Sequence, residues 1–312
     1  MTTGKKYQTI AILGAGAVGA YLIWGLSQKD HIDFCVTASG ERKQRFENKG
    51  FLINGQLYHP TVKTPAEAKG VDLLIVTVKY NSLSDALPDI REIVGENTVV
   101  VSLMNGVDSE EIIGDAIGYE HMLYSVIKVA SERNGNEVKF DPETTIGIIY
   151  GEKNGNFSDR VLAMNDLFEG TGLHYRASEK IISEIWSKFR LNVPNNQVQA
   201  MIGCGVGAYR DSEHVAFLQK AVLSELDAIA KAKGIDFNES DKSSSFGSKV
   251  KDRARYSTLQ DLDAKRHTEV DMFSGAVIRM GRELNIPTPY NEFVYHMIKA
   301  LEEKNDGLFD YQ

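Results

Sequence analysis

Short apolar runs alternate with polar-faced helical segments over the first 180 or so residues. Several of these runs are continuously apolar, as expected of strands that are covered on both faces. An Asn54-Gly55 pair between two runs predicts a tight hairpin. The alternation predicts a mainly parallel, doubly wound α/β sheet. We expect its strands at residues 9–13, 32–38, 51–53, 57–62, 71–79, 97–104, 123–130, 137–140, 146–150 and 173–176, with a helix at 158–168.

The pattern changes near Ser178, after which only helices and polar connections are expected. Apolar stripes at helical spacing predict helices at residues 181–201, 215–233, 268–284 and 291–304, and a polar, Ser-rich loop at 238–258. A chain of 312 residues is long enough for two domains. We therefore predict a Rossmann-type domain over residues 1–180 and an all-α domain over residues 181–312.

The stretch GAGAVG follows the first strand and opens a helix, with glycines spaced as GxGxxG. Gly14 would make the tight turn, Gly16 would let a pyrophosphate approach the backbone, and Gly19 would let the helix pack closely. Ala17 and Val18 begin the helix, whose N–H groups would face the phosphates. The motif predicts dinucleotide binding, and the alternative is a glycine turn that binds nothing.

The end of the second strand should determine which dinucleotide binds. No acid stands at its tip to hold a ribose 2′-hydroxyl, because Asp33 comes too early. Ser39 follows the strand, and the cations Arg42 and Lys43 come soon after. This favours NADP over NAD, although Glu41 lies close by and a solvated helix face would also explain the two cations.

Composition excludes several classes of function. The formal net charge is −8, which argues against a general nucleic-acid binder. Two cysteines, Cys35 and Cys204, are too few for a disulfide framework. The N-terminal residues lack the apolar region of a secretion signal, and the uncharged run 7–28 is interpreted as strand plus helix. We expect a cytoplasmic protein that does not associate with membranes.

Polar side chains follow two of the buried strands. Lys79 ends the VTVK segment, and Asn105-Gly106 follow the next strand in VSLMNGV. The carboxyl ends of parallel strands face the cofactor in such sheets, so both positions are candidates for the site. The alternatives are a cation leaving a strand into water and a simple turn.

A further set of polar residues lies in SKFRLNVPNNQVQAM. Lys188, Asn192 and Asn196 are spaced i, i+4, i+8 and share one helix face. A lysine and two amides in line would suit a carboxylate and a carbonyl, and the lysine could deliver a proton. A plain polar helix face is the alternative, and Pro194 is expected to kink this helix.

The segment RHTEVDMFSG has a structural interpretation on its own residues. Thr268 and Asp271 fit a capping box, and Glu269 would lie in the first helical turn. Ser257 and Gln260, in STLQD, would be loop residues. The seven histidines show no metal-ligand spacing, so no metal site is expected.

Together these segments resemble the ketopantoate reductase family over nearly the full length. The matching segments are ILGAGAVG, VTVK, MNGV, WSKFRLN, STLQD, HTEVDMFSGAV and IPTPYNE. The resemblance implies NADPH-dependent reduction of a 2-oxo acid to the (R)-2-hydroxy acid. It implies Lys188 as the catalytic lysine and Glu269 as an acid on the substrate side, which replaces the interpretation of Glu269 as a first-turn acid. It also implies substrate contacts by Asn105, Asn192, Asn196 and Ser257, and cofactor contacts by Lys79 and Asn105.

The sequence departs from the family pattern at three positions. Ser39 stands where many members carry an arginine for the 2′-phosphate, Pro194 lies between the two asparagines, and Met104 precedes Asn105. Similar relatives act as D-2-hydroxyacid dehydrogenases on bulkier acids such as mandelate, some with NAD. That activity, and a dinucleotide-binding regulator without catalysis, stay open as alternatives. A homodimer is also expected.

Overall fold

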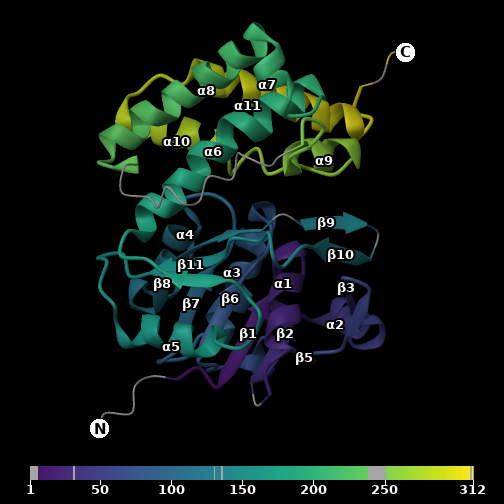
Figure 1. The fold of residues 1–312 in the computed structure, drawn as a ribbon, viewed down its shortest axis with the longest axis vertical. Coiled ribbons are helices and arrows are strands. Elements are labelled where there is room, and N and C mark those ends of the chain that lie inside the picture. The colour runs from purple at the N-terminus through teal and green to yellow at the C-terminus, as the bar shows by residue number, and fades with distance from the viewer. Residues whose placement is uncertain are drawn as a thin grey trace. The chain divides into compact units, whose positions relative to one another are not determined.

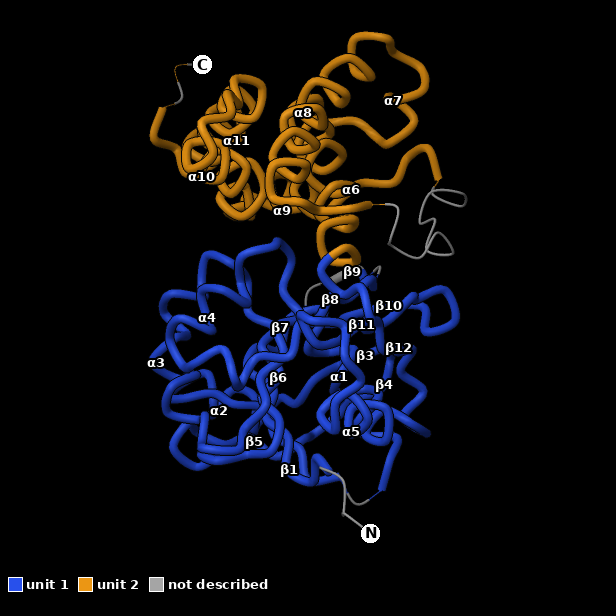
Figure 2. The backbone as a smooth tube through the Cα atoms, turned by 90° about the vertical axis from the view of Figure 1, so that its left-hand side faces the viewer, with its two compact units in different colours: residues 1–182 blue, residues 183–312 orange. Residues whose placement is uncertain are grey.

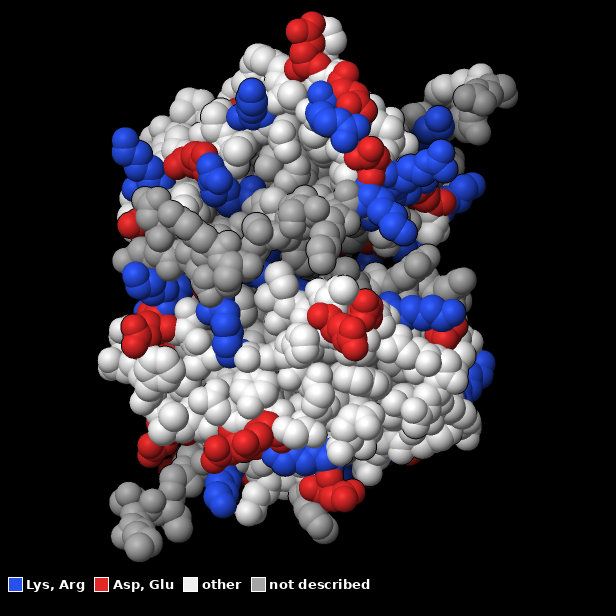
Figure 3. All heavy atoms as spheres, in the orientation of Figure 1, with Lys and Arg blue, Asp and Glu red and all other residues white. Residues whose placement is uncertain are grey.

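The structure is a computed structural model that describes residues 6–30, 32–129, 131–134, 136–237, 251–309 and 311, without the side chains of 132–134. The chain divides into two compact units, Met1–Ile182 and Ser183–Gln312 (Figure 2). Most of the predicted loop 238–258 lies outside the described residues. On the face drawn in Figure 3, acidic and basic side chains are interspersed over both units.

The first unit is built on an eight-stranded sheet of order β12-β11-β8-β7-β6-β1-β2-β5 (Figure 1). All its neighbouring strands run parallel except β8 and β11. The predicted doubly wound α/β fold is thereby confirmed. Its strands are β1 (Thr9–Leu13), β2 (Asp33–Thr37), β5 (Thr61–Lys63), β6 (Leu73–Val76), β7 (Val99–Ser102), β8 (Met122–Lys128), β11 (Gly147–Gly151) and β12 (Tyr175–Ala177).

A second sheet of four strands, in the order β4-β3-β10-β9, was not predicted. Its strands are β3 (Phe51–Ile53), β4 (Gln56–Tyr58), β9 (Ser131–Asn134) and β10 (Glu137–Phe140). The predicted hairpin is confirmed, since Asn54 and Gly55 both have positive φ, at 46° and 81°. The expected strand 57–62 was wrong as one element. Pro60, which has no N–H to donate, separates β4 from β5, and the two strands join different sheets.

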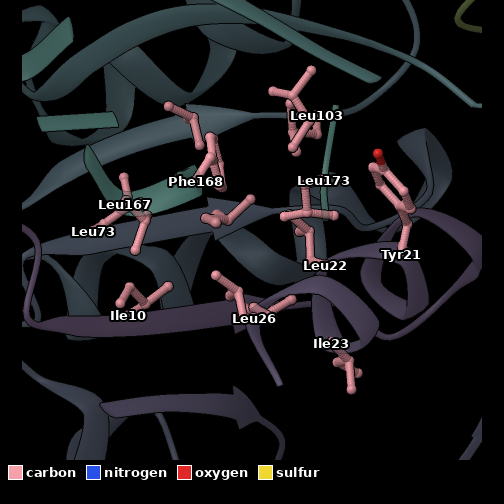
Figure 4. Packing of buried hydrophobic residues seen from close by; sticks show 14 of the residues in the cluster. Ile10, Tyr21, Leu22, Ile23, Leu26, Leu73, Leu103, Leu167, Phe168 and Leu173 are labelled. Carbon is pink, nitrogen blue, oxygen red and sulfur yellow. The ribbon is translucent and has the colours of Figure 1, made fainter. Parts of the chain in front are cut away.

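Helix α1 (Ala17–Leu26) lies at the centre of the core. Its residues Tyr21, Leu22, Ile23 and Leu26 are fully buried. Figure 4 shows Leu22 and Leu26 facing apolar side chains of the large sheet and of α5 (Asp159–Phe168), with Ile23 on the opposite side of the helix. Tyr21 also meets Phe140 of the second sheet edge-on, with ring centroids 5.1 Å apart. The helix that begins at the glycine turn is therefore packed into the core of the unit. The remaining helices of this unit are α2 (Gly40–Lys49), α3 (Leu83–Ile93), α4 (Ser109–Ile117), η1 (Ala66–Ala68), η2 (Tyr80–Ser82) and η3 (Tyr119–His121).

Helices are the only regular secondary structure in the described residues of the second unit. This unit contains all but the first two residues of α6 (Ile181–Ile202), and the whole of α7 (Ala208–Asp211), α8 (Glu213–Ala232), α9 (Ser257–Asp263), α10 (Ser274–Leu284) and α11 (Pro289–Asn305). The buried Glu225 of α8 accepts hydrogen bonds from the N–H groups of Tyr290 and Asn291, at 2.8 and 2.9 Å, and so caps α11. Among the described residues, no helix is long and apolar enough to cross a membrane.

Candidate active site

The three glycines of the turn differ in how much space surrounds them. Gly14 has φ +105°, and a Cβ there would lie 2.8 Å from the Thr77 carbonyl carbon. A Cβ at Gly19 would collide with the carbonyl oxygen of Gly14. Gly16 has no neighbour within 4 Å of its Cβ position, counting described residues. The backbone at Gly16 is thus approachable, as a bound pyrophosphate would require.

The start of α1 fits an anionic group. The helix begins at Ala17 after Gly16, and Val18 lies in its first turn. Within the described residues, no side chain caps this end and no acid lies in that turn. Backbone N–H groups and the helix dipole are therefore directed at the open space beside Gly16.

The segment after β2 distinguishes the three candidates for a 2′-phosphate. Ser39 is exposed at the N-terminal cap of α2, and Arg42 is exposed in its first turn. Lys43 instead donates to the Val62 carbonyl oxygen at 2.9 Å and to the Glu67 carboxylate at 3.0 Å. The Thr64 N–H and the Lys43 ammonium hold the pKa of Glu67 at about 2, so this ion pair is charged at neutral pH.

Lys79 and Asn105 follow neighbouring parallel strands, as the sequence predicted. Lys79 is exposed at the start of η2, just after β6, and Asn105 is half-buried three residues after β7. Strand β6 pairs in parallel with both β1 and β7, so the glycine turn and these two loops lie along one sheet edge. The Tyr80 hydroxyl donates to Asp108 at 2.8 Å and links the two loops.

Two residues that support this edge were missed by the sequence analysis. Thr77 Oγ1 donates to the Gly14 carbonyl oxygen at 2.7 Å, and Asp108 precedes α4 and accepts the Tyr80 bond. The signal for Thr77 was its place in VTVK, where a polar residue interrupts a buried strand. Asp108 had no sequence signal, because its partner lies on a different loop.

Lys188, Asn192 and Asn196 lie on α6, which continues as one helix through Pro194. Their spacing puts them on one helix face. Lys188 and Asn192 are half-buried, whereas Asn196 is only 4% exposed. Asn196 Oδ1 is buried and has no hydrogen-bond partner among the described residues. A buried amide oxygen left unpaired is costly, so this atom has an unused capacity to accept a hydrogen bond.

The structure corrects the interpretation of the segment around Glu269. The capping box was wrong, because Thr268 Oγ1 donates to Glu302 and Asp271 accepts from Tyr295 and Lys299. The helix begins at Ser274, so Glu269 is half-buried in a turn that precedes it and not in a first helical turn.

Ser257 and Gln260 were also expected in a loop, yet they belong to α9. Ser257 is exposed at the first position of this helix, and Thr258 beside it is buried. A short helix of seven residues with a brief apolar pattern left little periodicity to detect.

Comparison with known proteins decides the family. Residues 10–150 match the family described as "Ketopantoate reductase PanE/ApbA", and residues 180–302 match "Ketopantoate reductase PanE/ApbA C terminal". The chain belongs to the ketopantoate reductase family. It is 30% identical over 309 residues to 2-dehydropantoate 2-reductase of Pyrococcus horikoshii. The aligned region covers 96% of this chain and 99% of that protein.

Solved structures of the ketopantoate reductase fold agree. A PanE/ApbA family ketopantoate reductase from Ralstonia eutropha superposes with a TM-score of 0.80 at 23% identity, covering 96% of this chain and 99% of that one. A ternary structure of D-mandelate dehydrogenase with NADH and anilino(oxo)acetate gives a TM-score of 0.82 at 23% identity, with the same coverage. The fold is thus shared by relatives that are named for different substrates.

Proposed function

We propose that this protein reduces a 2-oxo acid to the (R)-2-hydroxy acid with a nicotinamide dinucleotide, and that ketopantoate is its substrate. The observation that carries the proposal is that Lys188, Asn192 and Asn196, whose Oδ1 is unpaired among the described residues, share one face of α6. A proton donor beside hydrogen-bonding amides suits an acid that carries a carbonyl next to its carboxylate. The family and the 2-dehydropantoate 2-reductase relatives support the same reaction.

The dinucleotide would be held by the first unit. Gly14, Gly16, Ala17, Val18 and Gly19 form the turn that approaches the pyrophosphate. Lys79 and Asn105, on the loops after the neighbouring strands β6 and β7, would contact other parts of the cofactor. The bound reduced nicotinamide supplies the hydride that is added to the C2 carbonyl carbon.

The second unit supplies the proton and orients the acid. Lys188 Nζ donates a proton to the carbonyl oxygen as negative charge develops there, which yields the hydroxyl group. Asn192, Asn196 and Ser257 hold the carboxylate and the hydroxyl. Glu269 contacts the substrate side of the site.

NADPH is the proposed cofactor, with Ser39 and Arg42 as the contacts of its 2′-phosphate. Both are exposed after β2, where the adenosine ribose of such a cofactor lies. Lys43, the third candidate, is already bonded to Val62 and Glu67, which makes it a weaker candidate for this contact.

A D-2-hydroxyacid dehydrogenase acting on bulkier acids, with NADH, is the second candidate. The serine at position 39 favours it, because it stands where many members of the family carry an arginine for the 2′-phosphate. D-mandelate dehydrogenase, at 23% identity, shows that a relative of this name has the same fold. We also propose a homodimer, as one structural neighbour is described as a dimeric ketopantoate reductase from Staphylococcus aureus.

The test is a matrix of initial reduction rates for ketopantoate and benzoylformate, each with NADPH and NADH. The highest kcat/KM for ketopantoate with NADPH supports the proposal. A preference for benzoylformate with NADH supports the second candidate. Tight dinucleotide binding without turnover of any acid would overturn both and indicate a regulator.

A further inference from the structure

The turn that carries Glu269 is anchored from both of its ends. Thr268, Val270, Met272 and Phe273 have no exposed area, whereas Glu269 and Asp271 between them are half-buried. The N–H groups of Met272 and Phe273 both donate to the carbonyl oxygen of Glu269, at 3.0 and 3.1 Å. The turn thus holds the carbonyl oxygen of Glu269, and the residues on either side of it are buried.

Three polar residues on one face of α11 contact this turn. Glu302, which is 3% exposed, accepts bonds from the N–H and the hydroxyl of Thr268, both at 2.6 Å. Tyr295 donates to Asp271 at 2.8 Å. Lys299 lies between the two contacts, with its Nζ 2.7 Å from Asp271 and 3.4 Å from Glu302. The residues on both sides of Glu269 are therefore joined through one lysine.

Asp271 and Lys299 stabilise each other in their charged forms. Burial would raise the pKa of Asp271, but hydrogen bonds from Lys299 and Tyr295 outweigh it and lower that pKa. Burial would lower the pKa of Lys299, yet Asp271 and Glu302 raise it. Lys299 is thus a charged ammonium between two acids, and its removal would leave both without their shared cation.

We propose that Lys299 and Glu302 are positioning residues that hold Glu269 in the orientation needed to contact the 2-oxo acid. The inference rests on the proposed function, because it assumes that Glu269 contacts substrate. Neither α11 residue needs to touch the substrate, since each acts through the turn at 268–271. Loss of the lysine should let the turn relax and misplace the Glu269 carboxylate, and small misplacements of this kind lower rates strongly.

The test is a double-mutant cycle between Lys299→Met and Glu269→Ala. With Glu269 present, we expect Lys299→Met to lower kcat/KM for the 2-oxo acid by about tenfold while the KM for the dinucleotide stays unchanged. In the Glu269→Ala protein, the same substitution should change kcat/KM by less than about twofold. Lys304→Met, an exposed lysine one turn further along α11, is the matched control and should behave as wild type.

The outcomes separate this inference from the proposed function. Equal losses with and without Glu269, or no loss with Lys299→Met, would overturn the positioning role while the wild-type activity stands. A wild-type protein that reduces no 2-oxo acid would overturn the proposed function and this inference with it. If Lys299→Met fails to fold, Tyr295→Phe takes its place in the same cycle, because it removes a single hydrogen bond to Asp271.

Discussion

The Thr77 hydroxyl donates a 2.7 Å hydrogen bond to the carbonyl oxygen of Gly14, so the end of β6 holds the turn that follows β1. The same carbonyl oxygen lies too close to the position that a Cβ on Gly19 would take. Gly14 and Gly19 therefore serve the packing of the turn, while Gly16 faces open space. One motif thus contains two glycines whose Cβ positions are blocked by backbone and one that is open for the proposed dinucleotide.

This difference predicts opposite effects of two alanine substitutions. Gly16→Ala should leave the thermal unfolding midpoint near that of wild type but raise the Kd for the dinucleotide by about tenfold or more, since its methyl group enters the phosphate space. Gly19→Ala should lower the free energy of unfolding by about 2 kcal/mol or more, because the backbone must move. Thermal unfolding and fluorescence titration with NADPH measure both effects. A Gly16→Ala protein with unchanged affinity would contradict the proposed pyrophosphate contact.

Lys188→Ala should separate proton donation from cofactor binding. A well-placed general acid contributes about 10²- to 10⁴-fold to rate, so kcat should fall by about that factor. The Kd for NADPH should stay within about twofold of wild type, because no residue of the glycine turn changes. Steady-state kinetics and titration provide the two numbers. A Lys188→Ala protein with the kcat of wild type would show that this lysine is not the proton donor.

Most of unit 1 could be predicted because its buried strands are apolar and its turns carry strong local signals. The hairpin at Asn54-Gly55 and the glycine turn depend on positive φ values that few residues other than glycine and asparagine adopt. The second sheet could not be predicted, because β3 pairs with β10, more than 80 residues later in the chain. Such a pairing leaves no periodic mark in either segment.

The candidate site shows the same limit. The line of polar residues on α6 follows from helical spacing alone. The spacing of Thr268 and Asp271 fits a capping box. It does not reveal that the Asp271 carboxylate accepts hydrogen bonds from Tyr295 and Lys299 on another helix. Thr77 was missed for a similar reason, since its acceptor lies 63 residues earlier.

Arg42 and Lys43 should differ in their effect on cofactor choice. Arg42→Ala should raise the KM for NADPH by about tenfold, as expected for a lost charge-assisted bond, and leave the KM for NADH unchanged. Lys43→Ala should lower stability by less than about 1 kcal/mol and affect both cofactors alike, because its ammonium is paired with Glu67. If Lys43→Ala raised the KM for NADPH alone and Arg42→Ala did not, Lys43 and not Arg42 would be the contact of the 2′-phosphate. The measurement is KM for each cofactor in each variant.

Glu110 sets up a pH dependence of stability. This carboxyl is 3% exposed in the first turn of α4. Burial raises its pKa to about 7, although hydrogen bonds from the Ser109 hydroxyl and from backbone N–H groups oppose the shift. Between pH 4.5 and 7 the folded protein therefore keeps a proton that the unfolded chain has released.

The sign of the effect follows from proton linkage. A group that binds its proton more tightly when folded stabilises the protein at low pH, so the contribution of Glu110 is fully present below pH 4.5 and is lost by about pH 7. The size is roughly 3 kcal/mol for a shift of this magnitude. Glu110→Gln should remove this part of the pH slope, and the exposed neighbour Glu111→Gln should retain it. Urea unfolding at pH 5, 6, 7 and 8 measures the slope, and an unchanged slope in Glu110→Gln would show that another group carries it.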